Sequence, residues 1–187
     1  MNRTSRFTQG SLLVVGVAAG VVLLASPPIR AQASNCATVH AASVKMETTA
    51  YHMYFVDSAK AVEAENGGKP TTGESISVGG TMYFLNHGKW VKSPVSLAEM
   101  NAERDKHDWK KDTCTHLRDE SVNGEAAAVW RTHVVTEMSA VDTDMWISKS
   151  RGLVLKANSV MDLGAGPKSH TSARYDYTNV RAPAGVQ

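Results

Sequence analysis

The strongest constraint on the fold is the dipeptide Asn123-Gly124, which separates two alternating runs, CTHLRDESV and AAAVWRTHVVTEM. Asn-Gly is the preferred centre of a two-residue β-hairpin turn, because both residues tolerate the positive φ angles that the turn requires. Such a turn pairs Val122 with Glu125 and predicts that Leu117 lies opposite Trp130. One sheet face then carries Leu117, Trp130 and Val134, and the other carries His116, Arg118, Glu120 and Arg131.

Similar signals recur along the chain and predict a meander of eight or nine antiparallel strands. AYHMYFV alternates as a strand does, and short turns at residues 79–80, 86–88 and 150–152 separate further strand pairs. GAGP turns the chain before the last strand, SHTSARYDYTNV, which ends before Pro183. A sheet of this size must close, form a sandwich or curl around a covered apolar face.

Two segments predict helices. SNCATVHAASVKMET, residues 34–48, can form a short N-terminal helix with an imperfect apolar stripe. Ser96 and Glu99 form a capping box at the start of a second helix, which is expected to run from Leu97 to about Lys111. Its apolar stripe is narrow, so this helix should lie across an opening or on a surface. The stripe consists of Leu97, Met100 and Trp109.

The N-terminus has the pattern of a signal peptide. Arg3 and Arg6 precede an apolar run at residues 12–25, which is shorter than the ~20 residues that span a bilayer. Small residues at Ala31 and Ala33 predict cleavage before residue 34; the alternative is an uncleaved anchor. We therefore expect a signal peptide at 1–33, a single domain at 34–187, and a periplasmic or secreted location. Asn35 before Cys36 does not fit a lipobox, so lipidation is not expected.

Charge argues against nucleic acid as a partner. Three of the 20 basic residues, Arg3, Arg6 and Arg30, belong to the predicted signal peptide, which leaves 17 against 18 acidic residues. The mature chain is therefore near neutral and lacks the basic surface that neutralises phosphates.

The two cysteines, Cys36 and Cys114, predict one disulfide in an exported chain, with two free thiols as the alternative. This pairing conflicts with the hairpin register above. That register places Cys114 on the charged face, where a core-facing N-terminal helix would not reach it. Either a β-bulge shifts the alternation or the helix end wraps around the sheet edge.

Catalytic and metal-binding patterns are weak. The seven histidines are scattered without an HxxxH or HExxH pair, and no GxSxG, Walker or GxGxxG motif occurs. We therefore expect no enzyme activity, metal or cofactor. The methionines are core filler or, alternatively, flexible side chains that line a site for variable apolar ligands.

The C-terminal part of the chain carries a family resemblance. DMWISKSRGLVLKANSVMDLG followed by KSHTSARYDYTNVRAP is similar to periplasmic outer-membrane lipoprotein-sorting proteins, the lipoprotein-carrier (LolA-like) superfamily. In that family a WI motif, a G-L-x-L strand start and a closing YDY-x-N-V strand recur in this order. The resemblance implies an α+β fold: an antiparallel meander curled into an unclosed half-barrel, with an N-terminal helix and a lid helix. It also implies an apolar cavity that accepts acyl chains.

These observations predict a non-enzymatic carrier or binding protein for a hydrophobic ligand such as an acyl chain, a lipid or a lipoprotein. A membrane-bound donor or acceptor protein is a further expected partner. The alternative is an interaction or assembly protein of the same fold with a filled core, and a hydrolase or metal-binding protein is a third hypothesis. The residues expected to line the cavity are Met53, Phe55, Phe84, Met100, Trp109, Trp130, Leu155 and Met161.

Overall fold

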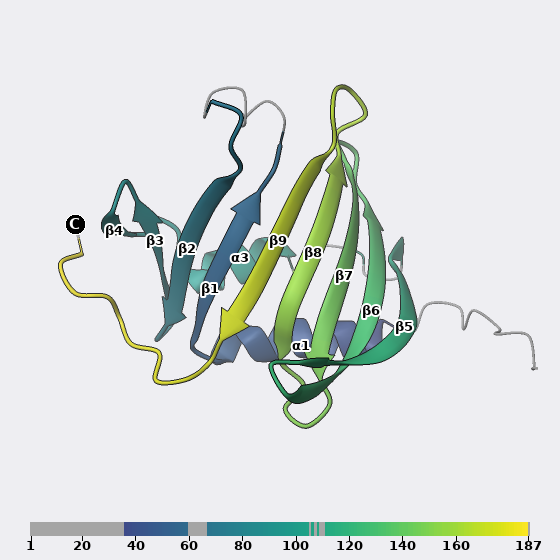
Figure 1. Ribbon diagram of the computed structural model, residues 1–187, viewed down its shortest axis with the longest axis horizontal. Coiled ribbons are helices and arrows are strands. Elements are labelled where there is room, and N and C mark those ends of the chain that lie inside the picture. The colour runs from purple at the N-terminus through teal and green to yellow at the C-terminus, as the bar shows by residue number, and fades with distance from the viewer. Residues whose placement is uncertain (1–35, 60–66, 105, 107, 109–110, 187) are drawn as a thin grey trace, which may run out of the picture. The chain divides into compact units, whose positions relative to one another are not determined.

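The alternating segments form one antiparallel sheet of nine strands in the computed structural model, which describes residues 36–186 without 60–66, 105, 107 and 109–110. The order across the sheet is β4-β3-β2-β1-β9-β8-β7-β6-β5 (Figure 1). The strands are β1 (Tyr51–Asp57), β2 (Thr71–Val78), β3 (Thr81–Asn86), β4 (Lys89–Lys92), β5 (Thr113–Val122), β6 (Glu125–Val135), β7 (Ala140–Ser148), β8 (Val154–Asp162) and β9 (Ser169–Asp176).

The sheet consists of two meanders that meet at its centre. Strands β1 to β4 form one and β5 to β9 the other, and β1 pairs with β9 from His52 opposite Asp176 to Asp57 opposite Thr171. The first and last strands of the chain are therefore neighbours. Strands β4 and β5 are the two edges, so the described sheet is unclosed, as the family resemblance implied.

The predicted hairpins are confirmed, including the one at Asn123-Gly124. Val122 pairs with Glu125, and the two turn residues have φ angles of 51° and 85°. Both angles are positive, which is the geometry of a type I′ turn and explains why Asn-Gly stands there.

The predicted register beyond this turn is wrong, because β5 contains a bulge. His116 lies opposite Trp130 and Arg118 opposite Val129, which leaves Leu117 as an extra residue. The bulge reverses the alternation, so Cys114 and Trp130 share one face while Leu117 joins the other. Of the two explanations for the position of Cys114, the structure shows the bulge.

The N-terminal helix, α1 (Ala37–Thr48), packs on the sheet face to which the bulge turns Cys114. Val39 and Ala42 are buried against Cys114, Ile147 and Val154. The predicted disulfide is present and joins Cys36, just before α1, to Cys114 in β5, with the two Cα atoms 5.1 Å apart. The disulfide and the apolar contacts of Val39 and Ala42 together hold α1 on the sheet.

The second helix, α3 (Leu97–Arg104), begins as predicted and ends earlier than the expected Lys111. The capping box is formed: the Ser96 amide donates to Glu99 Oε2 at 2.8 Å, and the Glu99 amide donates to Ser96 Oγ at 3.2 Å. Leu97 is buried. The sequence after Arg104 is mostly charged and offers few apolar side chains that could hold a longer helix against the sheet.

The two faces of the sheet differ in what covers them. One, here called the helix face, carries Trp130, Met145, Ala157 and Tyr175 and packs against α1 (Figure 1). The other, called the opposite face, carries Tyr54, Arg174, Lys156 and Trp146, which are consecutive neighbours across β1, β9, β8 and β7. The tip of the β5–β6 hairpin packs there through Val122 and the bulge residue Leu117.

Candidate functional site

The predicted cavity residues do not form one cavity. By strand register, five of them lie on the helix face: Met53, Phe55, Phe84, Trp130 and Met161. Met100 is partly buried in α3, and Trp109 lies outside the described residues. Phe84 and Met161 are 38% and 40% exposed, on strands far apart in the sheet order.

Leu155, which was expected to line the same cavity as these residues, lies on the other face of the sheet. Trp146 lies opposite Lys156 and Ile147 opposite Val154, so Leu155 is an extra residue at an irregularity in the β7–β8 ladder. It is buried on the opposite face in a cluster with Trp146 and Val129. Simple alternation cannot reveal this change, because it assumes a regular ladder.

A small cavity lies between the helices and the sheet, with a volume of about 260 Å³. Leu97 and Asn101 of α3 contribute to its wall, so α3 covers this cavity as the predicted lid would. None of the seven described residues that were expected to line the cavity is among its lining residues, which are Ser43, Met46, Glu47, Tyr51, Leu97, Asn101, Met145, Val154, Ala157 and Tyr175.

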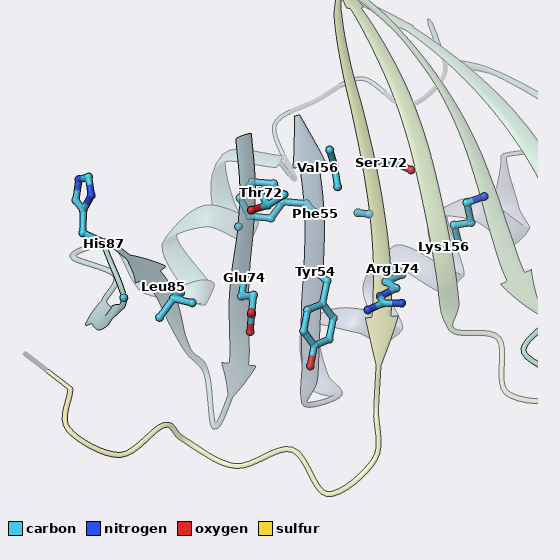
Figure 2. Close-up of a pocket in the computed structure, with 13 residues that line it drawn as sticks. Tyr54, Phe55, Val56, Thr72, Glu74, Leu85, His87, Lys156, Ser172 and Arg174 are labelled. Atoms are coloured by element: carbon cyan, nitrogen blue, oxygen red, sulfur yellow. The ribbon is translucent and has the colours of Figure 1, made fainter. Parts of the chain in front are cut away.

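A larger groove of about 670 Å³, here called the sheet groove, is the strongest candidate site (Figure 2). It spans β1, β2 and β9 and extends to the β3–β4 turn and to β8. Its wall mixes apolar and polar side chains and is formed by Tyr54, Phe55, Val56, Thr72, Gly73, Glu74, Leu85, His87, Gly88, Lys156, Ser172, Ala173 and Arg174.

A second hollow of about 520 Å³ continues the sheet groove toward the β5–β6 hairpin. The two share Tyr54, Lys156 and Arg174, so these three residues lie where the hollows meet. The hairpin contributes Val122 and Asn123 to the wall of the second hollow. We call the second space the hairpin hollow.

Val56 stands at the centre of the apolar part of the sheet groove. It lies between Thr72 on β2 and Ser172 on β9 and is 42% exposed. Leu85 contributes further apolar surface from β3 (Figure 2). An exposed valine between two small polar residues leaves room above the sheet for an apolar group.

A hydrogen-bonded cluster forms the polar end of the sheet groove. His52 Nε2 lies 2.9 Å from Glu74 Oε2, and the Tyr54 hydroxyl lies 3.1 Å from His52 Nδ1. If Nε2 carries the proton that Glu74 accepts, Nδ1 accepts the hydrogen bond of Tyr54. The imidazole also stacks on the Tyr54 ring, with 4.2 Å between the ring centroids. These contacts fix the orientation of Tyr54.

Two cations lie next to this cluster, on β9 and β8 on the side of β1 away from β2, and each stands against an aromatic ring. The Arg174 guanidinium carbon lies 5.0 Å from the centre of the Tyr54 ring, and Lys156 Nζ lies 4.4 Å from that of Trp146. Both distances are within the range of cation–π attraction. Figure 2 shows Arg174 beside Tyr54, with Lys156 on the next strand.

The tyrosines near the hairpin hollow are not suited to proton transfer at neutral pH. Burial raises the pKa of Tyr175 to about 12, and burial likewise raises the pKa of Tyr177. Both phenols therefore stay protonated. Within the described ranges, no group of three or more His, Cys, Asp or Glu side chains is arranged to hold a metal ion.

The sequence prediction missed Tyr54, Lys156 and Arg174. Alternation within a strand gives no reason to connect Lys156 with Tyr54, which lies about a hundred positions earlier. The connection depends on β1 pairing with β9 and β9 with β8. A signal was present in the aromatic and basic character of these positions, but their proximity required the strand order.

No family model and no curated protein matches the chain. Solved structures similar to it in fold include lipoprotein LppX from Mycobacterium tuberculosis, with a TM-score of 0.48 and 11% identity over 79% of this chain and 97% of that chain. LprF from Mycobacterium bovis has a TM-score of 0.42 and 11% identity over 81% and 94% of the two chains. MucB in complex with MucA(peri) has a TM-score of 0.45 and 12% identity over 81% and 58%. These TM-scores and identities are too low to assign a ligand or partner of those proteins to this chain.

Proposed function

We propose that the chain is a non-enzymatic binding or carrier protein for a hydrophobic ligand, held in the sheet groove on the opposite face. The observation that carries the proposal is the groove of about 670 Å³ with Val56 and Leu85 in its wall. Ligand pockets commonly measure about 300–1,000 Å³ and combine apolar walls with a few polar groups. The cavity under the helices, at about 260 Å³, is smaller than that range.

The proposal relocates the ligand relative to the sequence prediction. Two of the predicted residues border the large spaces. Leu155 borders the hairpin hollow, and Phe55 borders the sheet groove at its position between Tyr54 and Val56, although by register its side chain belongs to the helix face. The other described members of the predicted set line neither space. A ligand in the groove would contact the sheet directly, on the face away from α1.

We also propose that the protein acts outside the cytoplasm. The Cys36–Cys114 disulfide supports this location, because disulfides persist mainly in oxidising compartments. The predicted signal peptide and its cleavage site lie outside the described residues. In the ranges that the structure does describe, no helix is long and apolar enough to cross a bilayer.

The binding site is tested by placing a charge in the apolar part of the groove. Val56→Glu should weaken the binding of an uncharged naphthylamine dye by about 10-fold or more, because the ligand would bury an unpaired carboxylate. The free energy of unfolding should change by no more than about 0.5 kcal/mol, since Val56 is a surface position. Fluorescence titration and chemical denaturation measure the two quantities.

Val135→Glu is the matched control. Val135 is also a β-strand valine, is 57% exposed, and lines neither the sheet groove nor the hairpin hollow. The Val135→Glu variant should bind the dye as tightly as the wild type does. Equal affinity of the wild type and Val56→Glu would place the ligand elsewhere, and no dye binding to the wild type would favour the interaction protein with a filled core. Mass spectrometry of molecules extracted from the native protein would identify the natural ligand.

A further inference from the structure

Lys156 and Arg174 form a like-charged pair directly opposite each other on β8 and β9. Like charges at directly opposed positions destabilise a sheet, so this pair is not explained by the stability of the strands. Both residues line the sheet groove and the hairpin hollow. The unfavourable pairing therefore stands at the junction of the two spaces.

Neither cation is neutralised by a carboxylate in an ion pair within the part of the chain that the structure describes. Their close contacts are aromatic: Arg174 lies over Tyr54, and Lys156 lies over Trp146. An aromatic face orients a cation without cancelling its charge. Hydrogen-bond donors of both side chains thus stay available to an incoming anion.

The acidic groups around the pair are engaged by other partners. Glu74 is paired with His52, and Glu120 accepts hydrogen bonds from Trp146 Nε1 and Arg118, although its charge also attracts Lys156. Glu125 pairs with Arg151.

Asp176, one strand position beyond Tyr175, accepts the Thr178 amide at 2.8 Å, which lowers its pKa. It lies opposite His52 across the β1–β9 pair. Glu74 lines the sheet groove, Glu125 and Asp176 line the hairpin hollow, and the two cations line both spaces.

We infer that Lys156 and Arg174 bind the anionic head of an amphiphile, a phosphate or carboxylate group, whose apolar chain lies along Val56 and Leu85. This inference rests on the proposed function and names the ligand class for the same groove. The guanidinium of Arg174 can donate two parallel hydrogen bonds to such a group, and Lys156 adds a second charge from the neighbouring strand.

The test compares three probes that separate the head from the chain: dodecyl phosphate below its micelle concentration, dodecanol and inorganic phosphate. The wild type should bind dodecyl phosphate at least about 10-fold more tightly than dodecanol, because charge-assisted hydrogen bonds contribute that much. Inorganic phosphate in tenfold excess should not displace dodecyl phosphate. Displacement would show a free-anion site and would overturn the inference.

The double variant Lys156→Gln, Arg174→Gln should lose the preference for dodecyl phosphate over dodecanol, with a ratio near one. Its circular dichroism spectrum should match that of the wild type, which would show that the loss of preference does not come from unfolding. Arg131→Gln is the control: Arg131 lies on the same face, pairs with Asp144 and lines neither space. It should keep the preference.

The outcomes distinguish the two proposals. If the wild type binds neither the dye nor dodecanol, the proposed function fails. If it binds the dye, and dodecyl phosphate and dodecanol bind equally well, the proposed function stands and the anionic head is wrong. A preference that survives in the double variant would likewise overturn the role of Lys156 and Arg174.

Discussion

At the scale of single residues, Gly73 and Phe55 depend on each other. They are opposite neighbours on β2 and β1, and the Phe55 ring lies across the space where a Gly73 side chain would stand. A Cβ atom at Gly73 would come within 2.2 Å of Phe55 Cζ. Glycine in a strand usually weakens it, and here an aromatic neighbour covers the exposed backbone.

Gly73→Ala should therefore destabilise the protein by about 1–3 kcal/mol, because the ring must move to admit the methyl group. Chemical denaturation measures the change. In a Phe55→Leu background the same substitution should be close to neutral, since a smaller side chain leaves room. An equal loss in both backgrounds would mean that Phe55 is not the cause.

At the scale of elements, α1 depends on its tether. The helix has no side-chain N-cap, and its two buried residues, Val39 and Ala42, are small. The disulfide connects its start to β5 across 78 positions of sequence. The bulge at Leu117 makes this connection possible, because it turns Cys114 to the helix face.

Replacing both cysteines by serine should lower the free energy of unfolding by about 2–4 kcal/mol. The loop-entropy model gives about 4.5 kcal/mol for a loop of this length, and residual structure in the unfolded chain reduces that figure. Denaturation with and without reductant gives the same comparison for the wild type. The unreduced, unfolded protein should contain no titratable thiol; two reactive thiols there would contradict the disulfide.

At the scale of the whole molecule, carboxylates in several elements have lowered pKa values. Hydrogen bonds from Arg151 and Ser148 lower the pKa of Glu125, those from Trp146 and Arg118 lower that of Glu120, and Lys149 and His116 lower that of Asp119. These side chains are on or near the surface, so each contributes little. Protonation of each of these carboxylates at low pH lowers the free energy of unfolding, so their contributions add in the same direction.

The protein should therefore lose stability as the pH falls below about 4.5, the ordinary value for glutamate. A carboxylate with a lowered folded-state pKa contributes stability above its unfolded pKa and loses it on protonation. The melting temperature between pH 6 and about 3 measures the effect. Glu125→Gln should show a shallower decline, and a constant melting temperature in the wild type would contradict the expectation.

Much of the fold was readable from local sequence. The turn at Asn123-Gly124, the capping box of Ser96 and Glu99, and the alternation of β1 all appear where they were predicted. These signals depend on the φ preferences of turn residues and on side-chain periodicity, which neighbouring residues determine. The disulfide followed from the count of two cysteines.

The sequence by itself thus determined the strands, their turns, the N-terminal helix and the cysteine pair, because each depends on contacts along a short stretch of chain or on a single available partner. Tertiary structure decided the pairing of β1 with β9 and the irregularities at Leu117 and Leu155. The pairing brings Tyr54 beside Arg174, and the irregularities assign side chains to faces. Such features minimise the energy of the whole packed sheet, so residues far apart in the chain determine them together.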